Sequence, residues 1–331
     1  MTTRGTASAR TLLPLLLALT QAVSALAATP ESAFPNRPVR IVVPYPPGAS
    51  PNDATARIIQ PKLAEVMRQQ VVVDNRPGAG GTIGTDIVGK SSPDGHTLLL
   101  NSTSLTIVPN AYRNLPFDLY KDLAPITMLS AAPQLVMVNS AVPAATLKEL
   151  FAYVKARPGQ FKYSSGGHGT LPHLSGELIN YMAGLQMLHV PYKGGAPAAA
   201  ALISGEVQMF VGTSTGALGN IKAGRLKVLG VAAKQRTSLL PDVPTMEEAG
   251  LPGYEVRVWY GIWAPAKTPR PIIQTLYRHV RAALDAPETR ARFAASDAEI
   301  VGSTPEEFTR AFHAELKRWS KFVSETGLKL D

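Results

Sequence analysis

Short apolar runs alternate with longer segments of helical hydrophobic spacing along most of the chain. The first run, residues 39–43, is nearly continuous and rich in valine, which is typical of a strand buried on both faces of a parallel sheet. After a proline-rich loop, Ile59, Leu63, Val66 and Met67 fall on one face of a helix. The stretch 39–67 therefore predicts a strand, a tight loop and a helix, in that order.

The same alternation continues towards the C-terminus. Apolar runs predict a second buried strand at residues 71–74. They predict further strands at residues 98–100, 135–138, 161–164, 187–190, 207–211, 226–231 and 256–263. Helical spacing predicts helices at residues 82–90, 146–157, 171–183, 196–203, 271–284 and 287–294, and a last helix that opens at Thr304. Residues 102–126 are less periodic. The alternation favours an α/β fold with parallel sheets.

Two of the predicted helices carry recognisable starting residues. Asn52 or Asp53 is placed to cap the helix after the first strand. Thr304, Pro305 and Glu307 combine a capping box with proline at the first helical position. The buried face of this last helix is predicted to consist of Phe308, Phe312, Leu316, Trp319 and Val323.

Residues 1–27 have the features of a secretory signal peptide. Arg4 and Arg10 form a basic region without acids, residues 12–19 are almost wholly apolar, and residues 25–27 form a small-x-small cleavage signal. The apolar segment is shorter than the ~20 residues that a membrane span needs. We therefore expect cleavage near Ala27 and a soluble, exported chain, which in a Gram-negative source lies in the periplasm.

Composition narrows the classes of protein further. The 331 residues are 45% hydrophobic and 17% charged, and at ~100–200 residues per domain this length indicates two domains. The absence of cysteine excludes disulfides, thiolate metal sites and thiol nucleophiles. The net charge of +9 comes from scattered Lys and Arg, so we interpret it as solvated surface charge and expect no nucleic-acid partner.

Two loops that join a predicted strand to a predicted helix are candidate binding elements. Residues 44–51 are rich in proline, and residues 164–170 are rich in glycine and serine. Each loop leads to a helix N-terminus, where unpaired backbone N–H groups attract anions. Neither loop contains Lys or Arg, so we expect an anion there to be held by amides and helix N-termini.

The glycine loop at residues 78–84 does not complete a dinucleotide-binding fingerprint. Gly78 and Gly80 fit the pattern, but Ile83 stands where its third glycine belongs. We therefore expect no nucleotide cofactor and interpret this loop as a turn or a wall of the ligand cleft.

A serine hydrolase is the alternative interpretation of the chain. Residues 212–216 match the G-x-S-x-G elbow, with Ser214 as the nucleophile, and they follow a predicted strand. Downstream acids and histidines that could complete a triad are Asp242, Asp285, His279 and His313. Both histidines lie on helical patterns rather than on loops after strands, which weakens this hypothesis.

The histidines show no spacing typical of a metal site. His168 and His173 have Glu177 as their only nearby acidic candidate, and no histidine pair has the zinc-protease spacing. The sequence therefore predicts no bound metal.

Seven segments along the chain form a characteristic series: VRIVVPYPPGAS, VVVDNRPGAGGTIG, SPDGHTLLL, LKELFAYVKARPGQFKYSSGGHGTLPHLSGEL, HVPYKGGAPA, LPDVPTMEEAGLPGYE and GSTPEEF. In this order they resemble the substrate-binding receptors of tripartite tricarboxylate transporters, also called Bug receptors. The resemblance covers nearly all of the mature chain. It implies a type II periplasmic binding protein fold, in which two α/β lobes joined by crossover strands hold the ligand between them.

The resemblance also implies lobe boundaries and partners. The first lobe would comprise residues 28–132 and 233–331, and the second residues 133–232. Family members bind small carboxylates and deliver them to a two-component inner-membrane permease, and they are not enzymes. We accordingly expect a monomeric receptor without a cofactor, whose ligand is a di- or tricarboxylate or an aromatic acid.

In the family, the loop after the first strand and the glycine loop of the second lobe hold the ligand. We carry these loops onto this chain and add residues expected to form an aromatic wall. The expected ligand-binding residues are then Tyr45, Pro47, Ala49, Ser50, Asn52, Asp53, Gly167, His168, Gly169, Thr170, His173, Tyr192, Thr213, Ser214, Trp259 and Tyr260. Asp53 belongs to this loop. Its i,i+4 spacing to Arg57, however, predicts an ion pair on the helix surface rather than a contact with the ligand.

Two departures from the family pattern bear on the ligand. Ala49 replaces the second glycine of the commoner P-P-G-G loop. Residues 211–214 lack the acidic residue that some members carry for an amino group, which favours a simple carboxylate over an amino acid.

Overall fold

The computed structural model describes residues 1–2, 34–48, 50–112, 114–214 and 216–328. The chain separates into two compact units, residues 1–36 and 37–331, and the elements below all belong to the second unit. The predicted signal peptide falls outside the described residues apart from its first two positions, so it stays a prediction. Within the described ranges, no helix has both the length and the apolar character needed to cross a bilayer.

A six-stranded mixed sheet has the strand order β11–β4–β10–β3–β1–β2. Its strands are β1 Val39–Val43, β2 Val71–Asn75, β3 Thr97–Ser102, β4 Leu123–Pro133, β10 Arg257–Pro265 and β11 Glu299–Ile300. β1 pairs in parallel with β2 and β3, whereas β10 runs antiparallel to β3 and β4. The carboxyl ends of β1, β2 and β3 therefore meet at one edge of the sheet.

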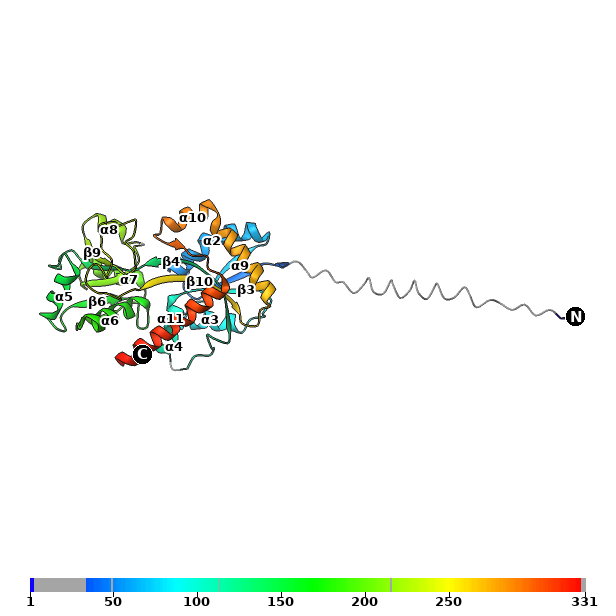
Figure 1. Ribbon diagram of the computed structural model, residues 1–331, viewed down its shortest axis with the longest axis horizontal. Coiled ribbons are helices and arrows are strands. Elements are labelled where there is room, and N and C mark those ends of the chain that lie inside the picture. The colour runs from blue at the N-terminus through cyan, green and yellow to red at the C-terminus, as the bar shows by residue number, and fades with distance from the viewer. Residues whose placement is uncertain (3–33, 49, 113, 215, 329–331) are drawn as a thin grey trace. The chain divides into compact units, whose positions relative to one another are not determined.

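Helices cover both faces of this first sheet. They are α2 Pro51–Met67, α3 Thr82–Gly89, α9 Arg270–Asp285, α10 Pro287–Ala294 and α11 Pro305–Thr326, with the short elements η1 Ala79–Gly81, η2 Thr103–Thr106 and α4 Val108–Ala111. Val42 and Leu99 share a core with Phe308 and Phe312 of α11 on one face of the sheet. Their neighbours along each strand face the other side, because successive strand residues point in opposite directions. Helices α2 and α9 pack against each other and against the sheet (Figure 1).

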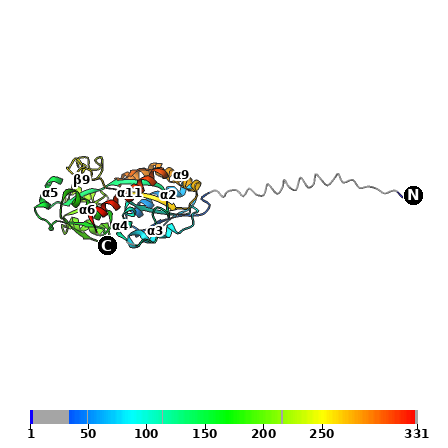
Figure 2. The same ribbon diagram turned by 60° about the horizontal axis from the view of Figure 1, so that its bottom comes forward.

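A five-stranded mixed sheet has the order β7–β6–β8–β5–β9. Its strands are β5 Leu135–Asn139, β6 Lys162–Ser165, β7 Leu188–Pro191, β8 Met209–Gly212 and β9 Leu226–Val231. β6 is parallel to β7 and β8, and β5 is antiparallel to β8 and β9. In both views its helices α5 and α6 lie to one side of α2, α3 and α9 (Figures 1 and 2).

The two faces of this second sheet have separate cores. Its helices are α5 Leu147–Lys155, α6 Leu171–Ala183, α7 Gly195–Ser204 and α8 Leu218–Lys222. Val136 and Val138 belong to a cluster with buried residues of α5 and α6. The alternate residues Leu135 and Met137 belong to a cluster with residues of α7. This alternation is the expected signature of a strand covered on both faces.

The chain passes between the sheets at two places that hydrogen-bond to each other. Gln134 alone separates β4 from β5, and the return passes through residues 232–256. The Ala232 amide donates to the Gln134 carbonyl over 2.8 Å, and the Val256 amide donates to the Ala232 carbonyl over 3.1 Å. The first bond ties the two crossings together side by side, and the second joins the two ends of the return segment.

Helix α11 contributes to two of the hydrophobic clusters. Phe308 and Phe312 pack in the core of the first sheet. Trp319 and Phe322, further along the helix, pack in the cluster that contains buried residues of α5 and α6. The C-terminal helix therefore braces the region where the two sheets join.

Most predicted elements are present, with corrections to their pairing and ends. The sheets are mixed rather than parallel, and the eleven-residue strand β4 was not predicted. β2 is an edge strand rather than a buried one, with Val72 exposed. Ser50 caps α2 in place of Asn52 or Asp53, because its side chain accepts from the Asp53 amide.

The predicted start of α11 is confirmed, and its buried face is nearly so. Thr304 and Glu307 exchange the two hydrogen bonds of a capping box. Phe322 is buried in place of the predicted Val323, which is only partly buried.

Candidate functional site

The loop between β1 and α2 is built around the carboxylate of Asp53. This side chain is 1% exposed. It accepts hydrogen bonds from the Gly48 amide (2.8 Å), the Asn75 side-chain amide (2.9 Å) and the Arg57 guanidinium (2.9 Å). Burial pushes the pKa of Asp53 up, but these bonds outweigh it and hold the pKa below its usual value.

The predicted ion pair between Asp53 and Arg57 is therefore confirmed, but Asp53 is not on the helix surface. Both carboxylate oxygens are occupied by groups of the loop and its neighbours. Asn75 also donates to the Tyr45 carbonyl over 2.9 Å, which joins the end of β2 to this loop. Asp53 thus fixes the shape of the loop, and its oxygens are not free to meet a ligand.

Tyr45 lies in a polar cluster at the carboxyl ends of β1 and β3. Its hydroxyl donates to Asn101 Oδ1 over 3.4 Å, and the hydroxyls of Ser102 and Ser104 lie beside it. Burial raises the pKa of Tyr45 to about 12, so its hydroxyl is protonated and can donate at neutral pH. Asn101, Ser102 and Ser104 were not predicted, although they directly follow the predicted strand 98–100.

The other predicted residues of this loop differ in their surroundings. Pro47 is exposed, and Ala49 lies outside the described residues. Asn52, in the first turn of α2, is 6% exposed, and its Oδ1 has no hydrogen-bond partner within the described part of the chain. The sequence thus places a buried, unpartnered polar atom beside the N-terminus of a 17-residue helix.

The glycine loop between β6 and α6 is held by bonds within itself. The Gly167 amide donates to Ser165 Oγ (3.1 Å), and Thr170 Oγ1 donates to the Gly167 carbonyl (2.8 Å). Gly167 and Gly169 have φ of +131° and +68°, which glycine adopts without strain. Thr170 begins α6 without a side-chain cap, so backbone N–H groups of the first turn remain available.

A second loop, residues 192–195 between β7 and α7, lies directly behind the glycine loop. The Gly194 amide donates to the Gly166 carbonyl over 3.1 Å. A Cβ on Gly166 would come within 3.1 Å of the Gly194 carbonyl carbon, so a larger residue would crowd this approach. Two helix N-termini, those of α6 and α7, therefore meet at the carboxyl edge of β6 and β7.

Three histidines gather against the glycine loop. The rings of His173 and His189 stack with centroids 3.8 Å apart, and His168 lies edge-on to both. The Gly169 amide donates to His173 Nδ1 over 3.1 Å, and His189 Nε2 lies 2.6 Å from Ser165 Oγ. Burial lowers the pKa of His173 to about 4 and of His189 to about 3. Both imidazoles are therefore neutral at pH 7.

Tyr192, Thr213 and Ser214 lie at the same edge of the second sheet, after β7 and β8. The Tyr192 hydroxyl donates to Glu206 Oε1 over 2.8 Å, which fixes its ring. Thr213 is half-buried and Ser214 is 2% exposed. The Ser214 carbonyl accepts from the amides of Ala217 and Leu218, so Ser214 lies in a tight turn.

The structure does not assemble the serine-hydrolase triad. The Asp285 carboxylate is bound by Arg281 and Arg290, and the ring of His313 packs against Tyr120. In the part of the chain described, no hydrogen bond joins Ser214 to a histidine.

The aromatic residues of β10 point to opposite faces. Trp259 packs among Trp263, Phe308 and Phe312, with centroid distances from 5.6 to 6.3 Å. This core packing explains its burial without any ligand. Tyr260 is buried next to Tyr45, and burial raises the pKa of its hydroxyl. Tyr260, unlike Trp259, therefore borders the predicted site.

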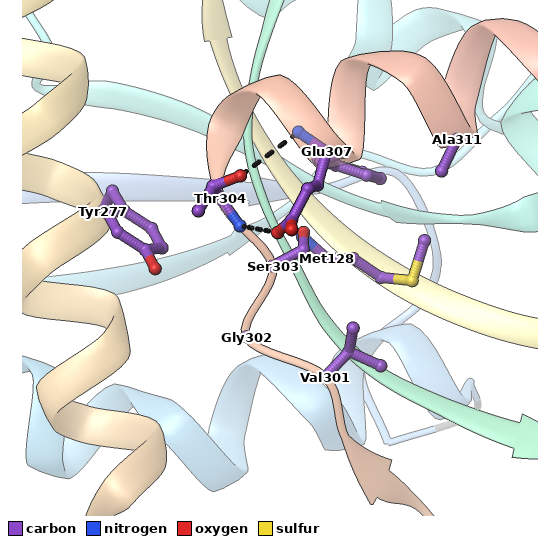
Figure 3. Close-up of a pocket in the computed structure, with 9 residues that line it drawn as sticks. Met128, Tyr277, Val301, Gly302, Ser303, Thr304, Glu307 and Ala311 are labelled. Atoms are coloured by element: carbon purple, nitrogen blue, oxygen red, sulfur yellow. Dashed lines mark hydrogen bonds between the residues drawn. The ribbon is translucent and has the colours of Figure 1, made fainter.

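Two surface hollows lie elsewhere. One, of about 440 Å³, is bordered by β4, α9 and the start of α11, with Met128, Tyr277 and Ser303 among its lining residues (Figure 3). Thr304 and Glu307 exchange their capping-box bonds at its wall (Figure 3). The other, of about 420 Å³, lies between α5 and Gly250. Neither hollow is lined by a predicted ligand-binding residue.

Two α/β sheets joined by paired crossings, with glycine- and proline-rich loops at their strand ends, define a two-lobed periplasmic binding protein fold. Residues 55–328 match the sequence model of the tripartite tricarboxylate transporter family receptor. The chain belongs to this receptor family.

Known proteins similar to this chain fall in the same class. The protein BugT of Bordetella pertussis is 38% identical over 308 residues, which cover 92% of this chain and 94% of BugT. The periplasmic binding protein BugD is 32% identical, with a TM-score of 0.79 over 89% of this chain and 99% of BugD.

Two similar structures contain dicarboxylates. MatC of Rhodopseudomonas palustris, with bound malate, is 32% identical, with a TM-score of 0.78 over 88% of this chain and all of MatC. A second R. palustris protein, with adipate, is 32% identical, with a TM-score of 0.81 over 89% of this chain and 99% of its own.

Proposed function

We propose that this protein is a solute receptor that binds a small organic carboxylate, in the first place an aliphatic dicarboxylate. The observation that carries the proposal is the similarity, over about nine tenths of the chain, to structures that hold malate and adipate. Malate and adipate share two carboxylates on a short aliphatic chain. A site in which each lobe binds one of the two carboxylates of the ligand would suit aliphatic dicarboxylates.

The proposed binding groups are backbone amides and neutral side chains. The first half of the site is the loop from Tyr45 to Asp53, which Tyr45 borders and which leads into the N-terminus of α2. The second half is the loop from Ser164 to Thr170, at the N-terminus of α6. Neither loop carries Lys or Arg. A helix N-terminus stabilises an anion by up to ~2 kcal/mol in partly buried geometry, so two such ends can replace a cationic side chain.

We also propose the lobe boundaries that the family resemblance implies. The first lobe comprises residues 28–132 and 233–331, and the second comprises residues 133–232. These limits agree with the membership of the two sheets and with crossings at Gln134 and Ala232. We expect the receptor to be a monomer, and rotation about the paired crossings would let its two lobes close on a ligand.

The proposed setting is the periplasm, after removal of residues 1–27. The receptor would there deliver its ligand to a two-component inner-membrane permease. Support for this setting comes from the signal-like N-terminus and from the similarity to periplasmic binding proteins.

Isothermal titration of the purified chain with malate, adipate, citrate, benzoate and the uncharged diamide of malate tests the proposal. We expect saturable binding of at least one carboxylate and none of the diamide, because the amides and helix N-termini favour negative charge. A melting temperature that rises with ligand should accompany binding. Absence of binding across a wider panel of organic acids would contradict the proposal.

The hydrolase alternative has its own test. Ester turnover by the wild-type protein that is lost in Ser214→Ala would favour it. Binding without turnover supports the receptor.

A further inference from the structure

Three histidines from a loop, a helix and a strand meet at the glycine loop. His168 lies in the loop, His173 lies in the first turn of α6, and His189 lies on β7. One ring nitrogen from each lies within 4.8 Å of the others. We propose that this histidine cluster binds a divalent transition-metal ion, with zinc as the best match to its donors.

The donor set selects the class of metal. Three imidazole nitrogens suit zinc, copper or nickel, whereas magnesium and calcium prefer oxygen ligands. Glu177 does not change this set, because its carboxylate accepts from the Tyr163 hydroxyl over 2.5 Å. Three nitrogens leave a fourth tetrahedral position of zinc open to water or an anion.

The cluster must contract to hold the ion. Tetrahedral zinc with Zn–N bonds of about 2.0–2.1 Å needs ligand nitrogens about 3.4 Å apart. His168 can supply much of this movement, because it is exposed and lies between Gly167 and Gly169. The stacked rings of His173 and His189 must also separate, since a metal lies in the plane of each imidazole that binds it.

The hydrogen bonds of the buried rings indicate how the ion would enter. His173 Nδ1 accepts from the Gly169 amide, so the neutral ring carries its proton on Nε2. A metal at Nδ1 takes the place of that amide and leaves the proton where it is. His189 has Nε2 against Ser165 and offers Nδ1. Metal binding therefore releases the Gly169 amide and changes the glycine loop.

Zinc titration of the untagged full chain, stripped with a chelator and in a buffer free of carboxylates, tests the proposal. We expect one zinc ion per chain by calorimetry. His168→Ala should weaken binding at least tenfold, because it removes one ligand and its exposed side chain is not needed for folding. Cobalt should give a tetrahedral visible spectrum in the wild type that His168→Ala loses.

His279→Ala is the matched control, since it removes a histidine of α9 that lies outside the cluster. It should bind zinc as the wild type does. Equal affinity of all three proteins, several equivalent ions per chain, or no binding by the wild type would overturn the proposal. Since no carboxylate is present, the result does not depend on whether the proposed receptor function holds.

Discussion

Valine at Gly169 separates the binding role of the glycine loop from its contribution to stability. Gly169 has φ of +68°, in the left-handed region that β-branched residues avoid. Gly159, in the turn before β6, has φ of +70°, and nothing lies within 4 Å of where its Cβ would stand. Gly169→Val and Gly159→Val therefore introduce the same backbone strain, but only Gly169 lies in the proposed site.

The magnitudes follow from the backbone angle of Gly169 and from the amides of the glycine loop. A left-handed non-glycine residue costs about 1–2 kcal/mol, so both variants should lose about that much unfolding free energy. In a chain of this size, 1 kcal/mol lowers the melting temperature by about 1–2 °C. If valine turns the loop away, each lost amide bond to a carboxylate costs about 1.5–3 kcal/mol. That loss raises Kd about 10- to 150-fold.

Calorimetry with the best carboxylate of the panel, together with thermal melts monitored by circular dichroism, provides the measurement. Gly159→Val should melt lower than the wild type and bind with unchanged Kd. Gly169→Val should melt at a similar temperature and lose most of its affinity. A Gly169→Val protein that binds within twofold of the wild type would refute the role assigned to this loop.

Three further substitutions test the structural reasoning by urea unfolding. Asp53→Asn should lose about 1–3 kcal/mol at pH 7, because the buried carboxylate accepts charge-assisted bonds from Arg57 and the loop. Since the pKa of Asp53 is lower in the folded than in the unfolded state, its stabilisation is complete above about pH 4 and is lost as pH falls through the folded pKa. The difference from the wild type should therefore shrink in acid, and a constant difference would contradict this. Phe312→Ala should lose about 3–5 kcal/mol, because its fully buried ring packs among core aromatics, and a loss below about 1 kcal/mol would argue against that packing. Thr304→Ala should lose about 1 kcal/mol while Thr304→Ser retains the cap, and equal losses would show that the cap hydroxyl is not the cause.

The local parts of the fold were predictable because their signals are local. The bounds of α6 and β9 coincide with the predicted segments 171–183 and 226–231. The capping box at Thr304 needs only residues within one turn of helix. The one error on the α11 face is a choice between i+3 and i+4 after Trp319, since both positions lie near the same stripe at 3.6 residues per turn.

Strand β4 could not be predicted from its own residues. It begins and ends near prolines and carries alanines and serine without a clear apolar alternation. It is a strand because β10 pairs with it along nearly its whole length. Strand direction is equally non-local: β5 has the apolar run typical of a parallel strand, yet both its neighbours run antiparallel to it.

The site was predictable as two loops but not as a set of contacts. The glycine and proline patterns marked both loops, and the family resemblance related them to a carboxylate. His189 was missed because 24 residues separate it from Ser165, and only the pairing of β6 with β7 sets it opposite Tyr163. Asn75 was missed for the same reason, since it reaches Asp53 across the pair β1–β2.

The contacts of the two loops also indicate which parts of a closing receptor would move. Asp53 binds three groups within or beside the first loop, and Ser165, Thr170 and His173 bind within the second. Loops bonded in this way lose little conformational freedom when a ligand arrives, which lowers the entropic cost of binding. The crossings at Gln134 and Ala232 are joined by one backbone bond instead. Closure should therefore change backbone angles at the crossings and leave the shape of both loops unchanged.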